Sequence, residues 1–270
     1  MEKKSLDIHG KNRLKAQTNH FCMEITPAIA ELSGAFAADG SMQQEHLCMW
    51  GNITEDREYY DTKLAPLYEK TFNVSLNVHE KKSNSVYGFY LCTPQVLEFF
   101  QETLGFTPGS KTYTVRVPEV IRNAKNPRIW AAFIRGYVDC DGNFYCMKRN
   151  ENSYAPVRRI LHMYPKISVA SVSKQIILDV SKLLNKLGVK HSVHEHEPKN
   201  PRFSTNWTIS VRGNKRVQHW MKVIGFNNPV QRSRYKIWKI HGFVPPGTDL
   251  HERRQILNGR RCPLEYYLAP

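Results

Sequence analysis

The sequence lacks the features that mark membrane-spanning and exported proteins. It contains no run of about 18 consecutive apolar residues, so no segment is expected to span a bilayer. The opening stretch, MEKKSLDIHGKNRLK, is polar and basic and has no apolar core of a signal peptide. We therefore expect an intracellular protein, cytoplasmic or nucleoid-associated, that is not secreted and has no membrane partner.

Cysteine pairs with metal-binding spacing are also missing. The six cysteines form no CxxC pair, which argues against a zinc site. Reduced and mostly buried thiols are the expected state of Cys22, Cys48, Cys92, Cys140, Cys146 and Cys262.

Carboxylates are scarce relative to cations. The chain has 24 Asp and Glu against 39 Lys and Arg, a formal net charge of +15. Such an excess attracts a polyanion, either nucleic acid or acidic lipid. The hydrophobic fraction of 41% and the aromatic fraction of 11% are those of a globular protein. The 270 residues are therefore expected to fold throughout, as one large domain or two small ones.

Two of these few carboxylates lie in similar stretches, which indicates an internal repeat. ELSGAFAADGSM (31–42) and RGYVDCDGNF (135–144) both bring a run of small and apolar residues to an Asp-Gly pair. Later segments correspond in the same order: NVHE (77–80) with SVHE (192–195), and LGF (104–106) with IGF (224–226). Order is preserved while the loops differ in length, as expected of a duplicated domain.

Each copy is expected to contain a helix, two strands, a second helix, two more strands and a third helix. In the second copy, apolar residues recur at helical spacing over 176–187 and 217–224, and NWTISVR (206–212) alternates as a half-buried strand. In the first copy we expect a helix near 54–71, strands near 74–80 and 86–92, and a helix from 96. The first hairpin of that copy, within 41–52, is too short for two full strands.

Small residues at intervals of four precede each Asp-Gly pair. Residues four apart share a helix face, so both helices present a groove that admits a neighbouring backbone. We expect the two grooves to pack together, through Ala30, Gly34 and Ala38 on one helix and Ala132, Gly136 and Cys140 on the other. Gly40 and Gly142 would follow as left-handed C-terminal caps.

This packing would bring Asp39 and Asp141 to the same end of the helix pair. At about 4 Å and an effective dielectric of about 20, two carboxylates repel by roughly 4 kcal/mol. A positive group is therefore expected between them. Carboxylate and main-chain carbonyl oxygens, without pairs of thiols or imidazoles, suit a hard cation such as Mg²⁺ or Mn²⁺.

LSGAFAADG (32–40) and IRGYVDCDG (134–142) resemble the motif of the LAGLIDADG homing endonucleases, in their single-chain, two-motif form. The resemblance implies an α+β fold of two αββαββα repeats, with saddle-shaped antiparallel sheets over DNA and the motif helices at the seam. The segments expected are a basic arm (1–24), a first repeat (25–124), a second repeat (125–228) and a basic C-terminal extension (229–270).

The resemblance also implies the residues of the site. Asp39 and Asp141 would be catalytic and bind the metal, together with the main-chain carbonyls of Ala38 and Cys140. The earlier acidic position of the motif is Asp139 in the second copy but Ala37 in the first. Asn52, Lys174 and Arg212 are candidates for the periphery of the site. The candidates for DNA contacts are Lys81, Lys82, Lys148, Arg149, Arg158, Arg159, Arg202 and Arg212.

The function that follows from the resemblance is a metal-dependent double-strand break with 3′ overhangs at a long asymmetric DNA site, in intron homing. The chain would act as a monomer on double-stranded DNA and would be free-standing or intron-encoded rather than an intein. Two alternatives use the same scaffold. One is a maturase that binds intron RNA, and the other is a catalytically inactive DNA-binding regulator.

Overall fold

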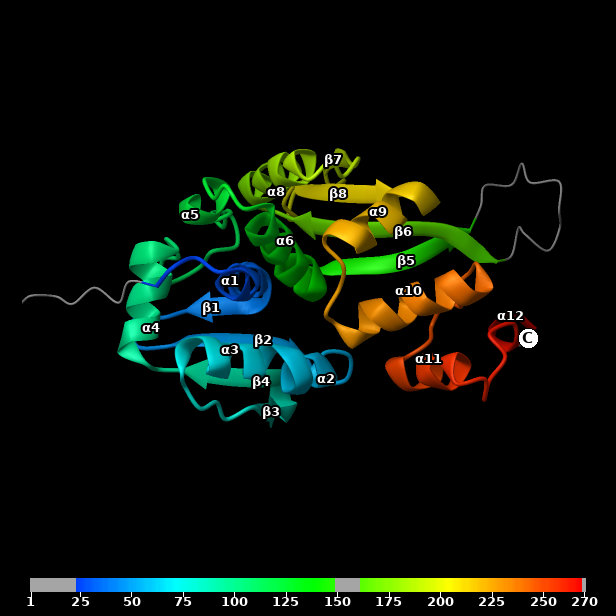
Figure 1. Cartoon of the computed structure of the whole chain (residues 1–270), viewed down its shortest axis with the longest axis horizontal. Coiled ribbons are helices and arrows are strands. Elements are labelled where there is room, and N and C mark those ends of the chain that lie inside the picture. The colour runs from blue at the N-terminus through cyan, green and yellow to red at the C-terminus, as the bar shows by residue number, and fades with distance from the viewer. Residues whose placement is uncertain (1–22, 149–160, 269–270) are drawn as a thin grey trace, which may run out of the picture.

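Two four-stranded antiparallel sheets flank a pair of central helices in the computed structural model, which describes residues 23–148 and 161–268 (Figure 1). The strands are ordered β1-β2-β4-β3 in one sheet and β5-β6-β8-β7 in the other, so corresponding strands occupy equivalent positions in the two repeats. The expected α+β fold with two copies of one unit is therefore confirmed.

The first repeat begins with helix α1. Its elements are α1 (Pro27–Asp39), β1 (Gly40–Met42), β2 (Leu47–Asn52), α2 (Arg57–Tyr59), η1 (Tyr60–Leu64), α3 (Ala65–Phe72), β3 (His79–Lys81), η2 (Lys82–Asn84), β4 (Val86–Leu91), α4 (Pro94–Glu98) and η3 (Phe99–Thr103), followed by the short helix α5 (Glu119–Arg122).

The second repeat begins with helix α6, and three helices follow it. The repeat comprises α6 (Pro127–Asp141), β5 (Gly142–Lys148), β6 (His162–Ser171), α8 (Lys174–Lys186), β7 (Ser192–His196), β8 (Asn206–Arg212) and α9 (Asn214–Val223). The remaining helices are α10 (Pro229–His241), α11 (Leu250–Leu257) and α12 (Glu265–Leu268). No helix within the two described ranges is long and apolar enough to cross a membrane.

The structure agrees with one expectation about the strands of the first repeat and corrects another. Its first hairpin is short, with β1 of 3 residues and β2 of 6, and is closed by a bond from the Gln43 amide to the His46 carbonyl. Residues 74–78 are not a strand, and β3 covers only His79–Lys81. Glu69 in α3 explains this, because it accepts from the Val74 amide through its carbonyl and from the Leu76 amide through its side chain.

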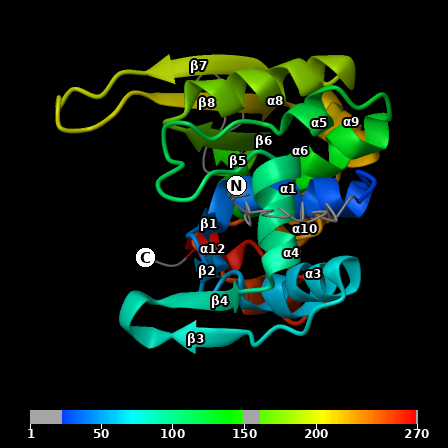
Figure 2. The same ribbon diagram turned by 90° about the vertical axis from the view of Figure 1, so that its left-hand side faces the viewer.

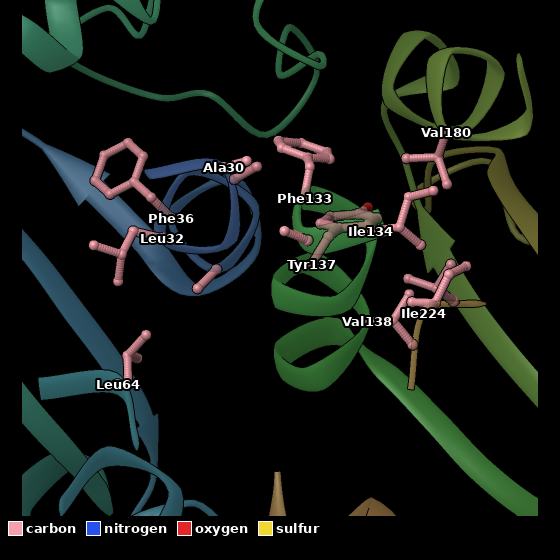
Figure 3. Close-up of a cluster of buried hydrophobic side chains, with 14 of the residues drawn as sticks. Ala30, Leu32, Phe36, Leu64, Phe133, Ile134, Tyr137, Val138, Val180 and Ile224 are labelled. Atoms are coloured by element: carbon pink, nitrogen blue, oxygen red, sulfur yellow. The ribbon is translucent and has the colours of Figure 1, made fainter. Parts of the chain in front are cut away.

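Helices α1 and α6 begin in the same way and pack directly on each other. The side chains of Thr26 and Asn126 cap their first turns, and a proline follows each cap. Leu32 and Phe36 point from α1 into the first repeat, whereas Ile134 and Val138 point from α6 toward Val180 and Ile224 of the second (Figure 3). Each helix thus packs against the core of its own repeat with one face and against the other motif helix with the opposite face.

Glycine permits this approach at two positions. A Cβ at Gly34 would lie 2.1 Å from the Phe133 carbonyl oxygen, and one at Gly136 would lie 2.0 Å from the Glu31 carbonyl oxygen. The small-residue spacing read from the sequence corresponds to this seam. Across it, the Arg135 guanidinium donates to the Glu31 carboxylate, 3.1 Å from Nε.

The expected left-handed caps at Gly40 and Gly142 are wrong. Both residues are extended, with φ of −75° and −98°, and each opens the strand that follows its helix. A side chain is excluded there for another reason. A Cβ would lie 2.2 Å from the Phe36 ring at Gly40 and 2.4 Å from Val138 Cγ1 at Gly142. The chain turns so tightly from helix to strand that only glycine fits.

The thiols are less buried than expected. Cys48 and Cys146 are buried and Cys140 is half-buried, but Cys92 and Cys262 are exposed. All five are free. Cys22 lies outside the described residues.

The C-terminal helices contact both repeats. The Gln231 amide of α10 accepts from the Phe144 amide and donates to the Gly142 carbonyl, so it completes the free edge of β5. From α11, Arg253 pairs with Glu55 of the first repeat at 3.5 Å, and Arg254 pairs with Glu58. The C-terminal extension therefore contacts both repeats and connects them.

Candidate functional site

Asp39 and Asp141 are the last residues of α1 and α6, and the charge of Asp141 acts on the Asp39 carboxyl. Burial, together with the nearby charges of Asp141 and Asp56, raises the pKa of Asp39 to about 7. Burial also raises the pKa of Asp141 to about 6, while the Lys111 ammonium opposes this shift. Two acids with raised pKa values, of which Asp141 lines a cleft, are the arrangement expected of a functional site.

Lys111 is the principal site residue that the sequence did not predict. Its Nζ donates to the Ala37 and Ala38 carbonyl oxygens at 2.5 and 2.8 Å, at the last turn of α1. Burial lowers the pKa of Lys111, and the charges of Asp141 and Asp39 raise it. Lys111 lies in the segment between the repeats, which has no periodic pattern, so no sequence signal connects it with the aspartates.

Two donors hold the Asp39 carboxylate. The Tyr60 hydroxyl donates to Oδ2 at 3.3 Å, and the Cys140 side chain also hydrogen-bonds to it and so lowers the Asp39 pKa. Asp39 is thus oriented by both repeats, because Tyr60 belongs to the first and Cys140 to the second.

A second network joins the repeats beneath the site. The Asp139 carboxylate, in a residue that is 1% exposed, accepts from the backbone amide of Asn227 at 2.7 Å. The side-chain amide of Asn228 donates to the Asp139 main-chain carbonyl at 2.9 Å and to the Asp56 carboxylate at 3.3 Å. Burial raises the pKa of Asp56 and raises that of Asp139 to about 8. Asp139 is therefore a structural carboxyl that anchors the chain before α10, with no contact to the solvent side of the site.

The donor atoms at the helix ends fit a hard divalent cation. Within the described ranges, no group of three or more His, Cys, Asp and Glu side chains is placed to hold a metal ion. A cation site here must therefore combine the two aspartates with main-chain carbonyls. The Ala38 carbonyl already accepts from a cationic group. Oxygen ligands of this kind suit Mg²⁺ or Mn²⁺ rather than zinc.

The three peripheral candidates have different surroundings. The Asn52 side chain accepts from the Thr54 and Glu55 amides and so forms the turn after β2. Lys174 lies 4.2 Å from the Trp207 ring centroid, and Trp207 belongs to the core-facing side of β8, so the structure does not bring Lys174 to the aspartates. Arg212, at the end of β8, has an Nε that is buried without a hydrogen-bond partner.

Arg212 forms part of a row across the outer face of the second sheet. Tyr145 is paired with Lys166, and Lys166 with Arg212, so the three side chains share that face. The Lys166 ammonium lies 5.3 Å from the Tyr145 ring centroid. The opposite face carries Ile209 and Val211, 2% and 0% exposed, as the alternation in NWTISVR predicts.

The other predicted DNA-binding residues lie on strand ends and hairpins. The β3–β4 and β7–β8 hairpins project to the same side of the molecule (Figure 2). Lys82 is exposed in the turn between β3 and β4, and Arg202 is exposed between β7 and β8. Lys148 is exposed at the end of β5, whereas Lys81 lies over the Trp50 and Tyr90 rings, at 4.2 and 4.4 Å. Arg149, Arg158 and Arg159 lie outside the described residues.

Comparison with known proteins finds one matching family model, in the second repeat. Residues 129–225 match the sequence model of a family described as a LAGLIDADG-like domain. The chain is also 25% identical over 169 residues to an A-type ATP synthase subunit from Pyrococcus abyssi (strain GE5 / Orsay). That alignment covers 62% of this chain and 14% of the relative, so the chain spans about a seventh of the curated protein it matches.

Two solved structures share the fold. Variants of the homing endonuclease I-DmoI match with a TM-score of 0.50 and 16% identity, over 74% of this chain and 96% of theirs. A further I-DmoI variant, crystallised with its nicked target DNA and manganese, matches with the same score and identity over 75% and 97%. The chain thus contains a LAGLIDADG-like domain in its second half and has the two-repeat fold of a single-chain LAGLIDADG homing endonuclease, as its sequence indicates.

Proposed function

We propose that the protein is a metal-dependent DNA endonuclease that acts as a monomer and cuts both strands of a long, asymmetric site. One observation carries the proposal. The two motif helices end in a pair of carboxylates with raised pKa values, half-buried Asp39 and the more exposed Asp141, between two sheets whose hairpins project to one side (Figure 2). Because the two repeats are related by a pseudo-twofold axis at this seam, a site there could act on the two antiparallel strands of a DNA duplex.

In this proposal the chain supplies the ligands and their orientation. Asp39 and Asp141, with the main-chain carbonyls of Ala38 and Cys140, would hold Mg²⁺ or Mn²⁺. When bound, the ion supplies Lewis acidity toward water and the phosphodiester. Tyr60 orients the Asp39 carboxylate at 3.3 Å. The dry helix seam excludes solvent from beneath the site, because Ala30 and Phe133, 0% exposed, fill it.

DNA would be held by the outer faces of the sheets. Lys166 and Arg212 on the second sheet and the hairpin residues Lys82 and Arg202 offer cations to phosphates. Hydroxyl and guanidinium groups on strands can also distinguish base edges in the major groove. By likeness to the family, we propose 3′ overhangs and a role in intron homing, with residues 25–124 and 125–228 as the two repeats.

Cleavage of a randomised duplex library in Mg²⁺, followed by sequencing of the ends, tests the proposal. The wild type should give discrete ends at one long site. Asp39→Asn and Asp141→Asn should lose cleavage or only nick, while still binding the site. Glu102→Gln, which changes an exposed carboxyl on η3, is the matched control and should cut normally.

Other outcomes would select the alternative functions. Sequence-specific binding without any cut in Mg²⁺ or Mn²⁺ would identify a DNA-binding regulator. Failure to cut any duplex, combined with binding and splicing of an intron RNA, would identify a maturase.

A further inference from the structure

The segment between the two repeats crosses the ends of both motif helices and is attached to each repeat. On one side, the Gly109 amide donates to the Met42 carbonyl at 2.9 Å, at the free edge of β1. On the other, the Ser173 hydroxyl donates to the Val115 carbonyl at 2.7 Å. Lys111 lies between these attachments, in a turn closed by the bond from the Val115 amide to the Lys111 carbonyl. Its side chain is therefore directed by a fixed backbone.

The Lys111 ammonium lies at the C-terminal end of α1, within the charge field of both aspartates. It donates to the Ala37 and Ala38 carbonyls, which no longer have partners within α1 because the helix ends there. It also carries the charge that opposes the raised pKa of Asp141. Lys111 thus contacts the Ala38 carbonyl and acts through its charge on Asp141 and Asp39, and the proposed function assigns all three groups to a metal ion.

A divalent ion on the Ala38 carbonyl would lie close to the Lys111 ammonium. The two cations would repel each other, in a cleft of about 390 Å³ that both Lys111 and Asp141 line. Binding of the ion therefore disfavours the Lys111 ammonium at this carbonyl.

We propose that Lys111 is a resident cation of the site, which holds the Ala38 carbonyl and neutralises the aspartates until a divalent ion displaces it. The inference rests on the proposed function and deepens it. The segment between the repeats would then set the metal affinity of the enzyme and compensate the charge of the two carboxylates before the ion arrives. The competing interpretation is a permanent lysine cap on the end of α1, whose bonds metal does not change.

Titration of the full chain with Mn²⁺ alone, monitored by calorimetry or by electron paramagnetic resonance of free Mn²⁺, distinguishes the two. Lys111→Met removes the competitor and should bind Mn²⁺ roughly ten-fold more tightly than the wild type. Lys190→Met is the matched control, because it removes the same charge from an exposed residue after α8. It should bind Mn²⁺ like the wild type.

The outcomes separate failure of the inference from failure of the proposed function. If the wild type binds Mn²⁺ in an Asp141-dependent manner, and Lys111→Met binds it equally or more weakly, the inference alone is overturned. If neither protein binds Mn²⁺, the proposed metal site is overturned and the inference with it.

A measurement on the wild type keeps the inference testable should the variant fold poorly. Amine-reactive labelling with mass spectrometry reports the accessibility of each lysine. Lys111 should be protected in chelator and become several-fold more reactive in saturating Mn²⁺, whereas Lys190 should label equally in both. Equal protection of Lys111 in both conditions would identify it as a permanent cap.

Discussion

Asp39 and Asp141 are the two site residues whose acidity the fold alters. Each carboxyl lies at the negative end of a helix and has a raised pKa, about 7 for half-buried Asp39 and about 6 for the more exposed Asp141. Near neutral pH, protons therefore compete for the oxygens that a metal ion would need. The consequence is measurable without knowledge of the DNA target.

The affinity for Mn²⁺ should depend steeply on pH. With pKa values of about 7 and 6, both carboxyls must lose their protons before an ion binds. The population with both ionised falls by about a hundred-fold between roughly pH 7.5 and 5.5. Calorimetric titrations across this range should show a matching loss of affinity. A flat profile down to about pH 5 would mean that the aspartates are not the ligands.

The metal-free protein should gain stability when Asp39 becomes neutral. The folded state holds a proton on Asp39 up to about pH 7, whereas the unfolded state releases it near pH 3.8. Stability therefore falls as pH rises through this window, and the ionised carboxylate is destabilising above it. Asp39→Asn should raise the free energy of unfolding at about pH 8 by roughly 2–4 kcal/mol, with little difference below about pH 4.

Urea unfolding in chelator at the two pH values measures this effect, with Glu102→Gln as the surface control. A loss of stability at high pH in Asp39→Asn would show that the carboxylate makes a favourable contact that the amide cannot replace.

At the scale of elements, the seam between α1 and α6 depends on glycine. A methyl at Gly34 would overlap the Phe133 carbonyl, at 2.1 Å, and one at Gly136 would overlap the Glu31 carbonyl, at 2.0 Å. Gly34→Ala and Gly136→Ala should each cost about 3 kcal/mol or more, because backbone must move apart. In an exposed helix the same change stabilises by about 1 kcal/mol. The sign of the change in melting temperature therefore decides whether the helices touch.

The sequence predicts well those elements whose apolar or small residues recur at a regular spacing. The four-residue spacing of Ala30, Gly34 and Ala38 places the seam, and the alternation in residues 206–212 identifies a half-buried strand. The Asp-Gly pairs predict the turns but not their geometry. Gly40 is required by the Phe36 ring and not by a positive φ, and a side-chain contact of this kind has no sequence signature.

Contacts between distant segments account for what the sequence does not predict. Lys111 lies 73 positions from the Ala38 carbonyl it contacts, and Asn228 lies 89 positions from Asp139. Both residues are in connecting segments whose composition indicates only loops or helix caps. The position of Lys174 at the start of a helix suggests a place near the site, but its ammonium lies on the Trp207 ring. Which face of an element a flanking residue takes is decided by packing.

At the scale of the molecule, the net charge of +15 predicts salt-dependent DNA binding. The logarithm of the association constant should fall linearly with that of salt, by about 0.9 per phosphate neutralised. Arg212→Gln should reduce the slope by about 1 if Arg212 contacts phosphate. Lys190→Gln, at an exposed position after α8, is the charge-matched control. Filter-binding or fluorescence titrations from about 50 to 200 mM salt measure both slopes, and equal slopes would exclude Arg212 from the phosphate contacts.

The whole molecule is also braced by its C-terminal helices, through one buried guanidinium. Arg253 is 0% exposed, and its Nε donates to the Ser233 hydroxyl at 2.9 Å. Its other nitrogens reach the Thr248 carbonyl and, at 3.5 Å, the Glu55 carboxylate of the first repeat. The side chain thus connects α10, α11 and the first repeat at a single point.

Loss of this guanidinium should therefore loosen one repeat from the other. Arg253→Met should lower the free energy of unfolding by roughly 3 kcal/mol, because the groups it pairs with lose a buried partner. Arg254→Met is the neighbouring control, since Arg254 pairs with Glu58 but is 51% exposed, and it should cost less than about 1 kcal/mol. Urea unfolding followed by tryptophan fluorescence compares the two variants. If they cost the same, the buried guanidinium adds nothing beyond an exposed ion pair, and the connection between the repeats rests on the seam of α1 and α6 and on the contacts of Asn228 with Asp56 and Asp139.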